Sequence, residues 1–309
     1  MLKKIIFMGT PIFAVPILKS LYQNGYPLSV VFTQSPKKSS RGMKTRKSPV
    51  HLMAETLNLD VRTPDTLKDN TVEYNFLKNL DADLAIVVAY GQILPEKFLS
   101  LTKKGFINIH ASILPHWRGA APIQRSIINL DKKTGLSIMK INNKLDSGPV
   151  CKKYEIEIKR QDNAETISEK LSLLASEKIL DDIDDIMAEK ANFIDQDHDK
   201  ATYAKKIEKV EGKINWNLGA DEILGLINGL CPSPGAWFTY KSERYKILRA
   251  EVGNSNGQPG IVISENLEVA CKEKSLKIIE IQREGKKVQK TGEFLLGSKI
   301  IKGSNLNNV

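Results

Sequence analysis

The stretch GFINIHASILP, residues 105–115, decides the expected fold and marks the candidate site. Its first half is a short apolar run, and strands buried on both faces of an α/β sheet are nearly continuous in Val, Ile and Leu. Because side chains alternate along a strand, Asn108 and His110 should point to the same side. Ligands of open α/β sheets bind outside the carboxyl ends of the strands. We therefore expect a strand over 105–109 that ends in a polar site.

A carboxylate is expected to join this site from further along the chain. The run TGLSIMKI (134–141) predicts a second strand, and the LDSG turn after it carries Asp146. Each residue alone has a plainer explanation, since an Asn-x-His pair often only satisfies its own hydrogen bonds and Asp-Ser-Gly often forms a turn. An amide donor, a titratable imidazole and a carboxylate in one place favour a catalytic site.

Strand and helix patterns alternate through the first half of the chain. Apolar runs predict strands at 4–8, 29–33 and 84–89. Ser48 and Pro49 are typical of an N-cap followed by the first residue of a helix. This repetition predicts an α/β fold for residues 1–189, with a Rossmann-like, doubly wound parallel sheet. The letters GTP at 9–11 form only a turn, because neither the dinucleotide fingerprint nor the phosphate-loop motif is present.

The last third of the chain has a different sequence pattern. Residues 207–309 contain short apolar runs separated by Gly, Pro, Asn and Ser, which predicts a small antiparallel β-barrel with one helix near 221–230. Residues 190–206 lack a periodic core pattern and are interpreted as a linker, in which His198 is exposed. The preceding helix, 166–190, carries four aspartates that we expect to form a solvated acidic face, not a metal site: Asp181, Asp182, Asp184 and Asp185.

Composition narrows the classes of protein. Of 309 residues, 46 are Lys or Arg and 36 are Asp or Glu, and the net charge of +10 favours a polyanionic partner. Three widely spaced cysteines argue against a disulfide framework or a thiolate metal site. No segment approaches the roughly 18 apolar residues that a spanning helix needs. We expect a cytoplasmic monomer without a metal and without membrane contact.

Much of the positive charge gathers in one segment. Residues 35–48 hold six basic residues and no acid, and they follow the second predicted strand: Lys37, Lys38, Arg41, Lys44, Arg46 and Lys47. A solvated loop is the plainer interpretation. Like charges repel, however, so we expect a loop that stays mobile until an anion neutralises it.

At these residues the chain resembles a known family. Asn108, His110 and Asp146 match the Asn-x-His…Asp set of the folate-dependent formyltransferase family. The run WRGAAPIQR (117–125) is similar to the signature of those members that formylate the initiator methionyl-tRNA. Further similar runs are IIFMGTP (5–11), VVAYGQILP (87–95) and PSPGAW (232–237). The resemblance covers nearly the whole chain.

The resemblance implies an activity and a set of site residues. The activity is transfer of a formyl group from 10-formyltetrahydrofolate to the amino group of methionyl-initiator-tRNA, with no metal and an OB-like barrel that holds the tRNA. The implied catalytic residues are Asn108, His110 and Asp146. The implied folate-binding residues are Tyr90, Gly91, Ile93, Ser112, Ile113, Leu114 and Pro115. The implied tRNA-binding residues are Lys37, Lys38, Arg41, Lys44, Arg46, Lys47, Arg118, Lys286 and Lys287.

Formyl transfer also explains why these residue types are needed. Asn108 and His110 could donate hydrogen bonds to the oxyanion, and Asp146 could hold the imidazole and pass a proton. The family's pattern is broken at Lys144 and Pro149, which leaves the shape of the folate loop open. Two other functions remain: formylation of a small amine, and RNA binding on an inert Rossmann-like scaffold. The first does not explain the basic segment, and the second does not explain the three catalytic residue types.

Overall fold

The computed structural model describes residues 3–39, 44–298 and 300–307 and divides the chain into two compact units. The first unit contains Met1–Gly119, Gly135–Ile156 and Ser168–Tyr203. The second contains Ala120–Thr134, Glu157–Ile167 and Ala204–Val309. The chain thus passes between the units several times. The boundaries expected from the sequence, at 189 and 207, stay a prediction.

A seven-stranded sheet forms the centre of the first unit, in the order β10-β9-β7-β6-β1-β2-β5. Its strands are β1 (Ile5–Gly9), β2 (Leu28–Phe32), β5 (Val61–Arg62), β6 (Leu84–Val88), β7 (Phe106–His110), β9 (Lys133–Lys140) and β10 (Val150–Glu157). The five strands from β7 to β5 pair in parallel, which confirms the Rossmann-like prediction. β9, however, is antiparallel to β7, so the sheet is mixed and not wholly parallel.

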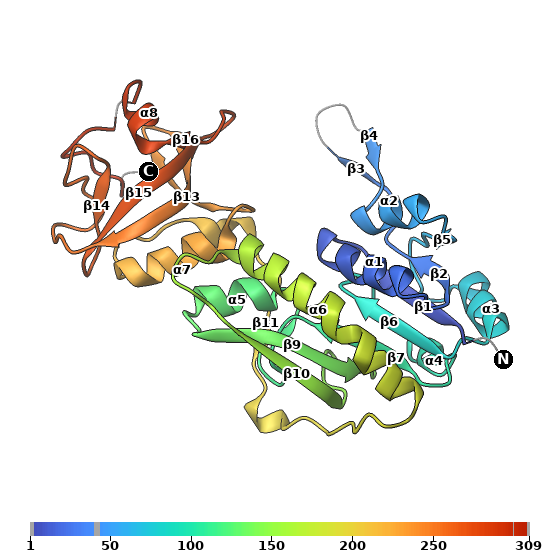
Figure 1. Cartoon of the computed structure of the whole chain (residues 1–309). Helices are drawn as coiled ribbons and strands as arrows, with labels where there is room; N and C mark the ends of the chain where they lie inside the picture. Colours follow the sequence, from blue (N-terminus) through green and yellow to red (C-terminus); the bar gives the residue numbers. More distant parts are fainter. Residues whose placement is uncertain (1–2, 40–43, 299, 308–309) are drawn as a thin grey trace. The chain divides into compact units, whose positions relative to one another are not determined.

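Helices cover this sheet and complete its core. They are α1 (Val15–Gln23), α2 (Pro49–Thr56), α3 (Thr71–Leu80), α4 (Glu96–Leu99) and α6 (Ala164–Met187), with a 3₁₀ turn at Ile12–Ala14. α1 and α6 lie side by side over the sheet in Figure 1, joined by a hydrogen bond from Ser20 Oγ to the Ser176 carbonyl. β1 and β6 are buried along their whole length. As predicted, Ser48 caps α2, because its Oγ accepts a hydrogen bond from the His51 N–H at 3.0 Å.

An antiparallel sheet forms the centre of the second unit, as expected, in the order β12-β13-β15-β14 with β16 beside β15. Its strands are β12 (Ala236–Tyr240), β13 (Glu243–Gly253), β14 (Glu268–Ala270), β15 (Ser275–Arg283) and β16 (Gln289–Lys290). The helices of this unit are α5 (Pro122–Ile128), α7 (Ala220–Leu230) and α8 (Thr291–Leu295), with a 3₁₀ turn at Lys209–Gly212. Phe238 stacks on Tyr245, and the edge of Trp216 meets Phe238 inside the core.

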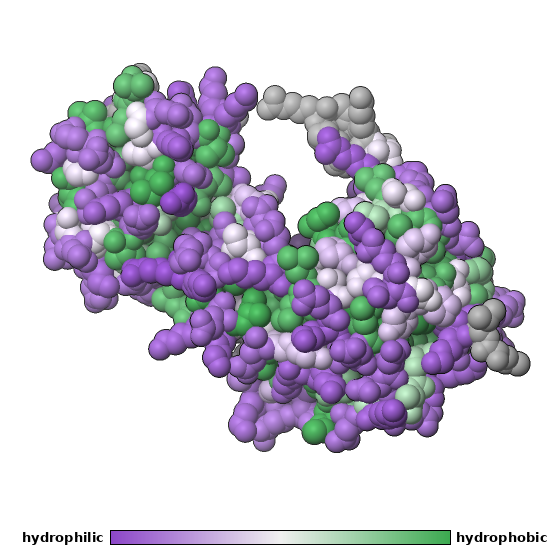
Figure 2. Space-filling view, in the orientation of Figure 1, coloured by the Kyte–Doolittle hydropathy of each residue, from purple (hydrophilic) through white to green (hydrophobic). Residues whose placement is uncertain are grey.

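The basic segment is more regular than the sequence suggested. Its ends pair as an antiparallel ladder, β3 (Lys37–Ser39) with β4 (Lys44–Arg46), that projects from the sheet beyond α2 (Figure 1). Arg41 lies outside the described residues. Figure 2 shows that the surface facing the viewer is mostly hydrophilic in both units, with small apolar areas between the polar side chains. In the part of the chain that is described, no helix is long and apolar enough to span a bilayer.

The expected linker also has structure of its own. Within it, β11 (Tyr203–Ala204) pairs with β8 (Arg118–Gly119), and a 3₁₀ turn covers His198–Lys200. His198 is exposed, as predicted. Ile194 forms a β-bridge with Val150 at the edge of the first unit. Polar sequence without a periodic pattern can therefore still be tied down by backbone hydrogen bonds.

The expected solvated acidic face on α6 is wrong at one position. Asp182 is only 2% exposed, and the Tyr154 hydroxyl donates a hydrogen bond to its Oδ1 at 2.7 Å. Its Oδ2 is buried and has no hydrogen-bond partner among the described residues. Burial raises the pKa of the Asp182 carboxyl because the charged form loses its hydration. Its neighbours Asp181 and Asp184 are exposed, as expected.

The buried carboxyl predicts a pH-dependent effect of Asp182→Asn. A raised folded-state pKa means that the wild type loses stability as pH rises through the range between the unfolded and the folded pKa of Asp182. Asn cannot ionise, so the Tm of the variant minus that of the wild type should increase from pH 4 to pH 7. Thermal melts across this range measure it. Asp181→Asn on the exposed face is the control and should show no such trend; an equal trend in both variants would contradict the assignment.

Candidate active site

Two polar side chains of β7 face the loop that carries Asp146. The period of two places Asn108 and His110 on the same side of the strand. Because β9 is antiparallel to β7, its last residue, Lys140, lies opposite Ile107. The loop after β9 must therefore run back along β7 to bring Asp146 to His110. The sequence predicted that these residues meet, but not this return path.

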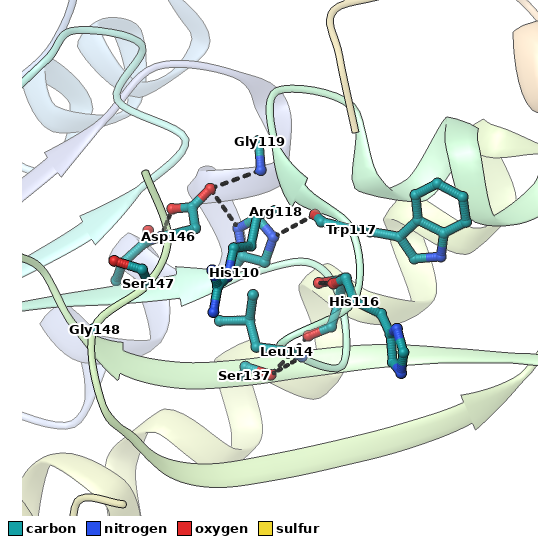
Figure 3. Close-up of polar contacts among 12 residues, drawn as sticks. His110, Leu114, His116, Trp117, Arg118, Gly119, Ser137, Asp146, Ser147 and Gly148 are labelled. Atoms are coloured by element: carbon teal, nitrogen blue, oxygen red, sulfur yellow. Dashed lines mark hydrogen bonds and ion pairs between the residues drawn. The ribbon is translucent and has the colours of Figure 1, made fainter. Parts of the chain in front are cut away.

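Asp146 is the meeting point of the site (Figure 3). Its Oδ2 accepts a hydrogen bond from the Gly119 N–H at 2.9 Å and lies 3.6 Å from His110 Nδ1. Its Oδ1 accepts a longer hydrogen bond, 3.4 Å, from Asn108 Nδ2. The other ring nitrogen of His110, Nε2, lies 3.0 Å from the Trp117 carbonyl oxygen. The convergence of the three predicted residues is confirmed, while their catalytic roles stay predictions.

The partners of His110 limit where its protons can be. A carbonyl oxygen only accepts, so Nε2 carries a hydrogen that it donates to the Trp117 carbonyl. Nδ1 lies 3.6 Å from Asp146 Oδ2, which is within ion-pair distance but too long for a hydrogen bond. In this arrangement His110 can donate to a substrate oxygen only if the Trp117 carbonyl is displaced. Asn108 can donate to a substrate more readily, because its one hydrogen bond is long and its second N–H has no partner among the described residues.

Three residues of the surrounding loops adopt a left-handed backbone. The φ angles are +47° at Ala89, +61° at Trp117 and +43° at Asp146. Such residues cost about 1–3 kcal/mol each and persist only where the surroundings hold them. Here the Thr202 Oγ1 accepts a hydrogen bond from the Trp117 N–H at 2.9 Å. In Figure 3 the Trp117 carbonyl points at His110 while its indole points away from that ring.

Gln196, which the sequence did not single out, holds two of these loops together. It is 8% exposed and uses both ends of its amide. Its Oε1 accepts hydrogen bonds from Arg118 Nε (3.1 Å) and Nη2 (2.7 Å). Its Nε2 donates to the carbonyl oxygens of Asp146 (2.9 Å) and Gly148 (2.7 Å). The loop that presents the carboxylate is thereby fastened to the loop that presents the Gly119 N–H. No motif marks Gln196, because it stands alone in a polar stretch.

The predicted role of Arg118 in binding tRNA finds little support. Its side chain is 3% exposed, and its guanidinium donates to Gln196 and, at 2.9 Å, to His198 Nδ1. A cation buried in this way is stabilised by its partners and is not presented to a ligand. Arg118 acts in this structure as the anchor for Gln196.

The predicted folate-binding residues 112–115 form a turn that hydrogen bonds hold in place. Ser112 and Leu114 are fully buried. Ser137 Oγ accepts a hydrogen bond from the Leu114 N–H and donates one to the Ser112 carbonyl, at 3.0 and 2.8 Å. Ser112 Oγ in turn donates to the His116 carbonyl. Ile113 and Pro115 are partly exposed and are therefore the members that a ligand can touch.

The three predicted folate residues after β6 differ in what they expose. Tyr90 is 1% exposed and its ring packs in the core against residues of α3 and α4, so only its backbone could reach a ligand. Gly91 has φ +82°, and a Cβ there would lie 2.2 Å from the Gln34 Nε2. Ile93 is 90% exposed. The Ile93 side chain is therefore available for contact with a ligand.

Apart from Arg118, the predicted tRNA-binding lysines and arginines lie on the surface where the structure describes them. Lys37 donates to Gln34 Oε1 at 2.6 Å, and Lys47 pairs with Glu55. Arg46 is exposed and has no ion-pair partner among the described residues. Lys286 and Lys287 are exposed on the β15–β16 turn. The side chains of Lys38 and Lys44 lie outside what the structure describes. Lys144 is exposed in the loop of Asp146, and the Pro149 carbonyl accepts from the Lys140 N–H.

Comparison with known proteins identifies the family. Residues 3–183 match the formyl transferase family, and residues 206–299 match the formyl transferase C-terminal domain. A methionyl-tRNA formyltransferase from Pelagibacter ubique is 64% identical over 310 residues, which is 100% of both chains. One from Rickettsia prowazekii is 43% identical and covers 97% of this chain and 98% of its own.

Solved structures share the fold at low sequence identity. WlaRD, a sugar 3N-formyl transferase determined with dTDP and 5-N-formyl-THF, has a TM-score of 0.71 at 20% identity and covers 93% of this chain and 100% of its own. An N-formyltransferase from Helicobacter canadensis, in complex with folinic acid and dTDP-3-aminofucose, has a TM-score of 0.69 at 18% identity, with coverage of 92% and 100%.

The fold and the two matched segments place the chain in the class of formyl transferases. Given the 64% identity over its full length, the chain belongs to the methionyl-tRNA formyltransferase family. The resemblance noted in the sequence is confirmed.

The contacts of Gln196 predict a local effect of Gln196→Glu. The new carboxylate still accepts from Arg118, but it cannot donate to the carbonyls of Asp146 and Gly148 and repels both oxygens. Amides of residues 142–148 should therefore exchange their hydrogens faster, as measured by hydrogen–deuterium exchange. The exposed Gln23→Glu on α1 is the matched control. Unchanged exchange in the 142–148 loop would show that Gln196 does not hold it.

Proposed function

We propose that this chain transfers the formyl group of 10-formyltetrahydrofolate to the free amino group of methionyl-initiator-tRNA, giving N-formylmethionyl-tRNA for translation initiation. One observation carries the proposal: Asn108, His110 and Asp146 meet at the end of β7. They do so in a chain that is 64% identical over its full length to a methionyl-tRNA formyltransferase.

The reaction needs a hydrogen-bond donor for the negative charge on the formyl oxygen and a group that accepts and returns a proton. When bound, 10-formyltetrahydrofolate supplies an activated formyl group. Asn108 offers an N–H to the charge that develops on the formyl oxygen. His110 and Asp146, 3.6 Å apart, can take up the proton that the attacking amine loses and return one to the leaving nitrogen. The backbone N–H of Gly119 keeps the carboxylate oriented while the proton moves.

The surroundings of the three residues support a folate. Ile93 exposes an apolar side chain, and the 112–115 turn has its inner polar groups already paired, so each offers apolar surface that a flat ring can contact. Two structural neighbours that share the fold were determined with folate compounds. We further propose that the protein is a cytoplasmic monomer.

Formylation of a small amine, as by the sugar formyl transferases, is the main alternative. The two functions differ in the acceptor and not in the trio of residues. The basic β3–β4 hairpin and the net charge of +10 favour a polyanionic acceptor. An inert RNA-binding protein would have no need for an imidazole and a carboxylate held 3.6 Å apart.

The direct test is incubation with formyl-labelled donor and either charged initiator tRNA or a dTDP-amino sugar. Label on the tRNA is the expected result. Label on the sugar alone would support the small-amine alternative. RNA binding without any label would support the inert scaffold.

The carboxylate predicts that Asp146→Asn lowers kcat. The amide keeps the shape and an acceptor for the Gly119 N–H, but it removes the charge that faces His110 Nδ1. Positioned acid–base groups contribute about 10²–10⁴ in rate, so a decrease of that order is expected in single-turnover formylation. The thermal melt should stay cooperative at nearly the wild-type Tm. A collapsed melt would instead show that Asp146 mainly stabilises its turn.

The basic hairpin predicts that Arg46→Ala weakens binding of tRNA and leaves the folate site alone. Removing the interaction with one phosphate lowers the slope of log K against log salt by about 0.7–0.9. The KM for charged tRNA should rise and its salt dependence flatten, while the KM for the formyl donor stays the same. Lys19→Ala, exposed on α1, is the control. Equal salt slopes for Arg46→Ala and wild type would remove Arg46 from the tRNA site.

A further inference from the structure

A short part of the expected linker, residues 196–202, contacts the loops on both sides of the His110–Asp146 pair. At one end, Gln196 Nε2 donates a hydrogen bond to the Asp146 carbonyl. At the other end, Thr202 is hydrogen-bonded to the loop whose carbonyl faces His110. All of these residues belong to the first unit. The segment can therefore act on both members of the pair.

Thr202 holds both peptide planes that flank Trp117. Its Oγ1 accepts a hydrogen bond from the Trp117 N–H at 2.9 Å, and its carbonyl oxygen accepts one from the Arg118 N–H at 2.8 Å. The far end of the first plane is held as well, because Ser112 Oγ donates to the His116 carbonyl. These contacts keep Trp117 at φ +61°, a conformation that a bulky residue rarely adopts.

The second of these planes connects Thr202 to the ring of His110. The Trp117 carbonyl and the Arg118 N–H belong to one planar trans peptide, so they point in opposite directions. Because the N–H points to Thr202, the carbonyl points to His110 and lies 3.0 Å from Nε2 (Figure 3). A carbonyl only accepts, so Nε2 keeps its hydrogen whether the ring is neutral or charged. The nitrogen that gains and loses a proton is then Nδ1, 3.6 Å from Asp146 Oδ2.

We propose that Thr202 is a positioning residue for formyl transfer: by orienting the Trp117 carbonyl, it keeps a hydrogen on His110 Nε2 and confines proton exchange to Nδ1, beside Asp146. The inference rests on the proposed function and deepens it. As the amine nitrogen bonds to the formyl carbon, its proton passes to Nδ1. When the bond from that carbon to the folate nitrogen breaks, the folate nitrogen takes the proton.

Loss of the Thr202 hydroxyl would act on this step through the tautomer of His110. Without that acceptor the Trp117 peptide can rotate, and the neutral ring can carry its hydrogen on Nδ1, facing the carboxylate. That tautomer has no lone pair at Nδ1 to accept the amine proton. The surfaces that bind the two substrates are unchanged, so the effect belongs to kcat and not to KM.

The kinetic test compares Thr202→Val, which keeps the shape but cannot accept, with Thr202→Ser, which keeps the hydroxyl. In formylation of charged initiator tRNA by the full chain, Thr202→Val should lower kcat by up to about 10²-fold, the effect of misplacing a reacting group by about 1 Å. The KM values for tRNA and for the formyl donor should stay at the wild-type level. Thr202→Ser should restore kcat. Thr71→Val, an exposed threonine at the start of α3, is the matched control.

The tautomer itself is measured by nitrogen-15 NMR, which needs no substrate. The chain has four histidines, and the signals of one ring are assigned with His110→Gln. In the neutral form of the wild type, the hydrogen of His110 should reside on Nε2. In Thr202→Val the Nε2 and Nδ1 signals should move toward each other, because both tautomers are populated. Thr202→Ser should keep the wild-type pattern.

Three results would overturn the proposal: equal kcat for Thr202→Val and Thr71→Val, a lowered kcat with unchanged His110 signals, or a Thr202→Ser variant as slow as Thr202→Val. Failure of the proposed function is a separate result, since it would show as wild-type chain that transfers no label to tRNA. The NMR comparison would still decide whether Thr202 sets the tautomer of His110.

Discussion

The site depends on one carboxylate that three other groups hold in place. Asp146 accepts hydrogen bonds from the Gly119 N–H and from the Asn108 side-chain amide, and it faces His110 Nδ1. A partly buried charge is stable only where hydrogen bonds and an opposite charge replace its missing water. Gln196 extends this hydrogen-bond network to a second loop. Its amide links the Asp146 backbone to the buried Arg118, which is part of the strand pair β8–β11.

Positive φ angles at non-glycine residues occur in several loops of the chain, and three of these residues lie around the site. Ala89, Trp117 and Asp146 all have a positive φ, and they lie on three separate loops. Conformations of this kind are held by the rest of the structure and gather at functional sites. At Trp117 the consequence is visible, because the turned carbonyl takes the Nε2 hydrogen of His110. The protein thereby holds the imidazole in one orientation.

Charge and chemistry are kept on different residues. The groups around Asp146 are buried or half-buried, so their interactions are strong and weakly screened. The basic hairpin β3–β4 carries exposed cations, whose interactions are screened by salt. The geometry around Asp146 is therefore fixed by buried contacts, whereas the hairpin charges depend on the surrounding solution.

Local pattern alone was enough for much of the molecule. Residues 105–109 were predicted as a strand because an apolar run needs burial, and Asn108 and His110 were placed on one side because strands have a period of two. Ser48 and Pro49 marked the start of α2 because capping is local. The family followed from short motifs around Asn108, His110, Asp146 and Trp117, and the antiparallel texture of the C-terminal unit from its frequent turns.

Other features were decided only when distant segments met. Strand direction is not encoded in a run of apolar residues, so the antiparallel pairing of β9 and the return path of the Asp146 loop were not predicted. The burial of Asp182 depends on Tyr154, 28 residues away. Gln196 lies 78 residues from Arg118 and 50 from Asp146, and nothing in a polar stretch shows which amide will be enclosed. Hydrogen bonds across such distances exist only after the chain has packed, because burial creates both the need for a partner and the proximity that supplies it.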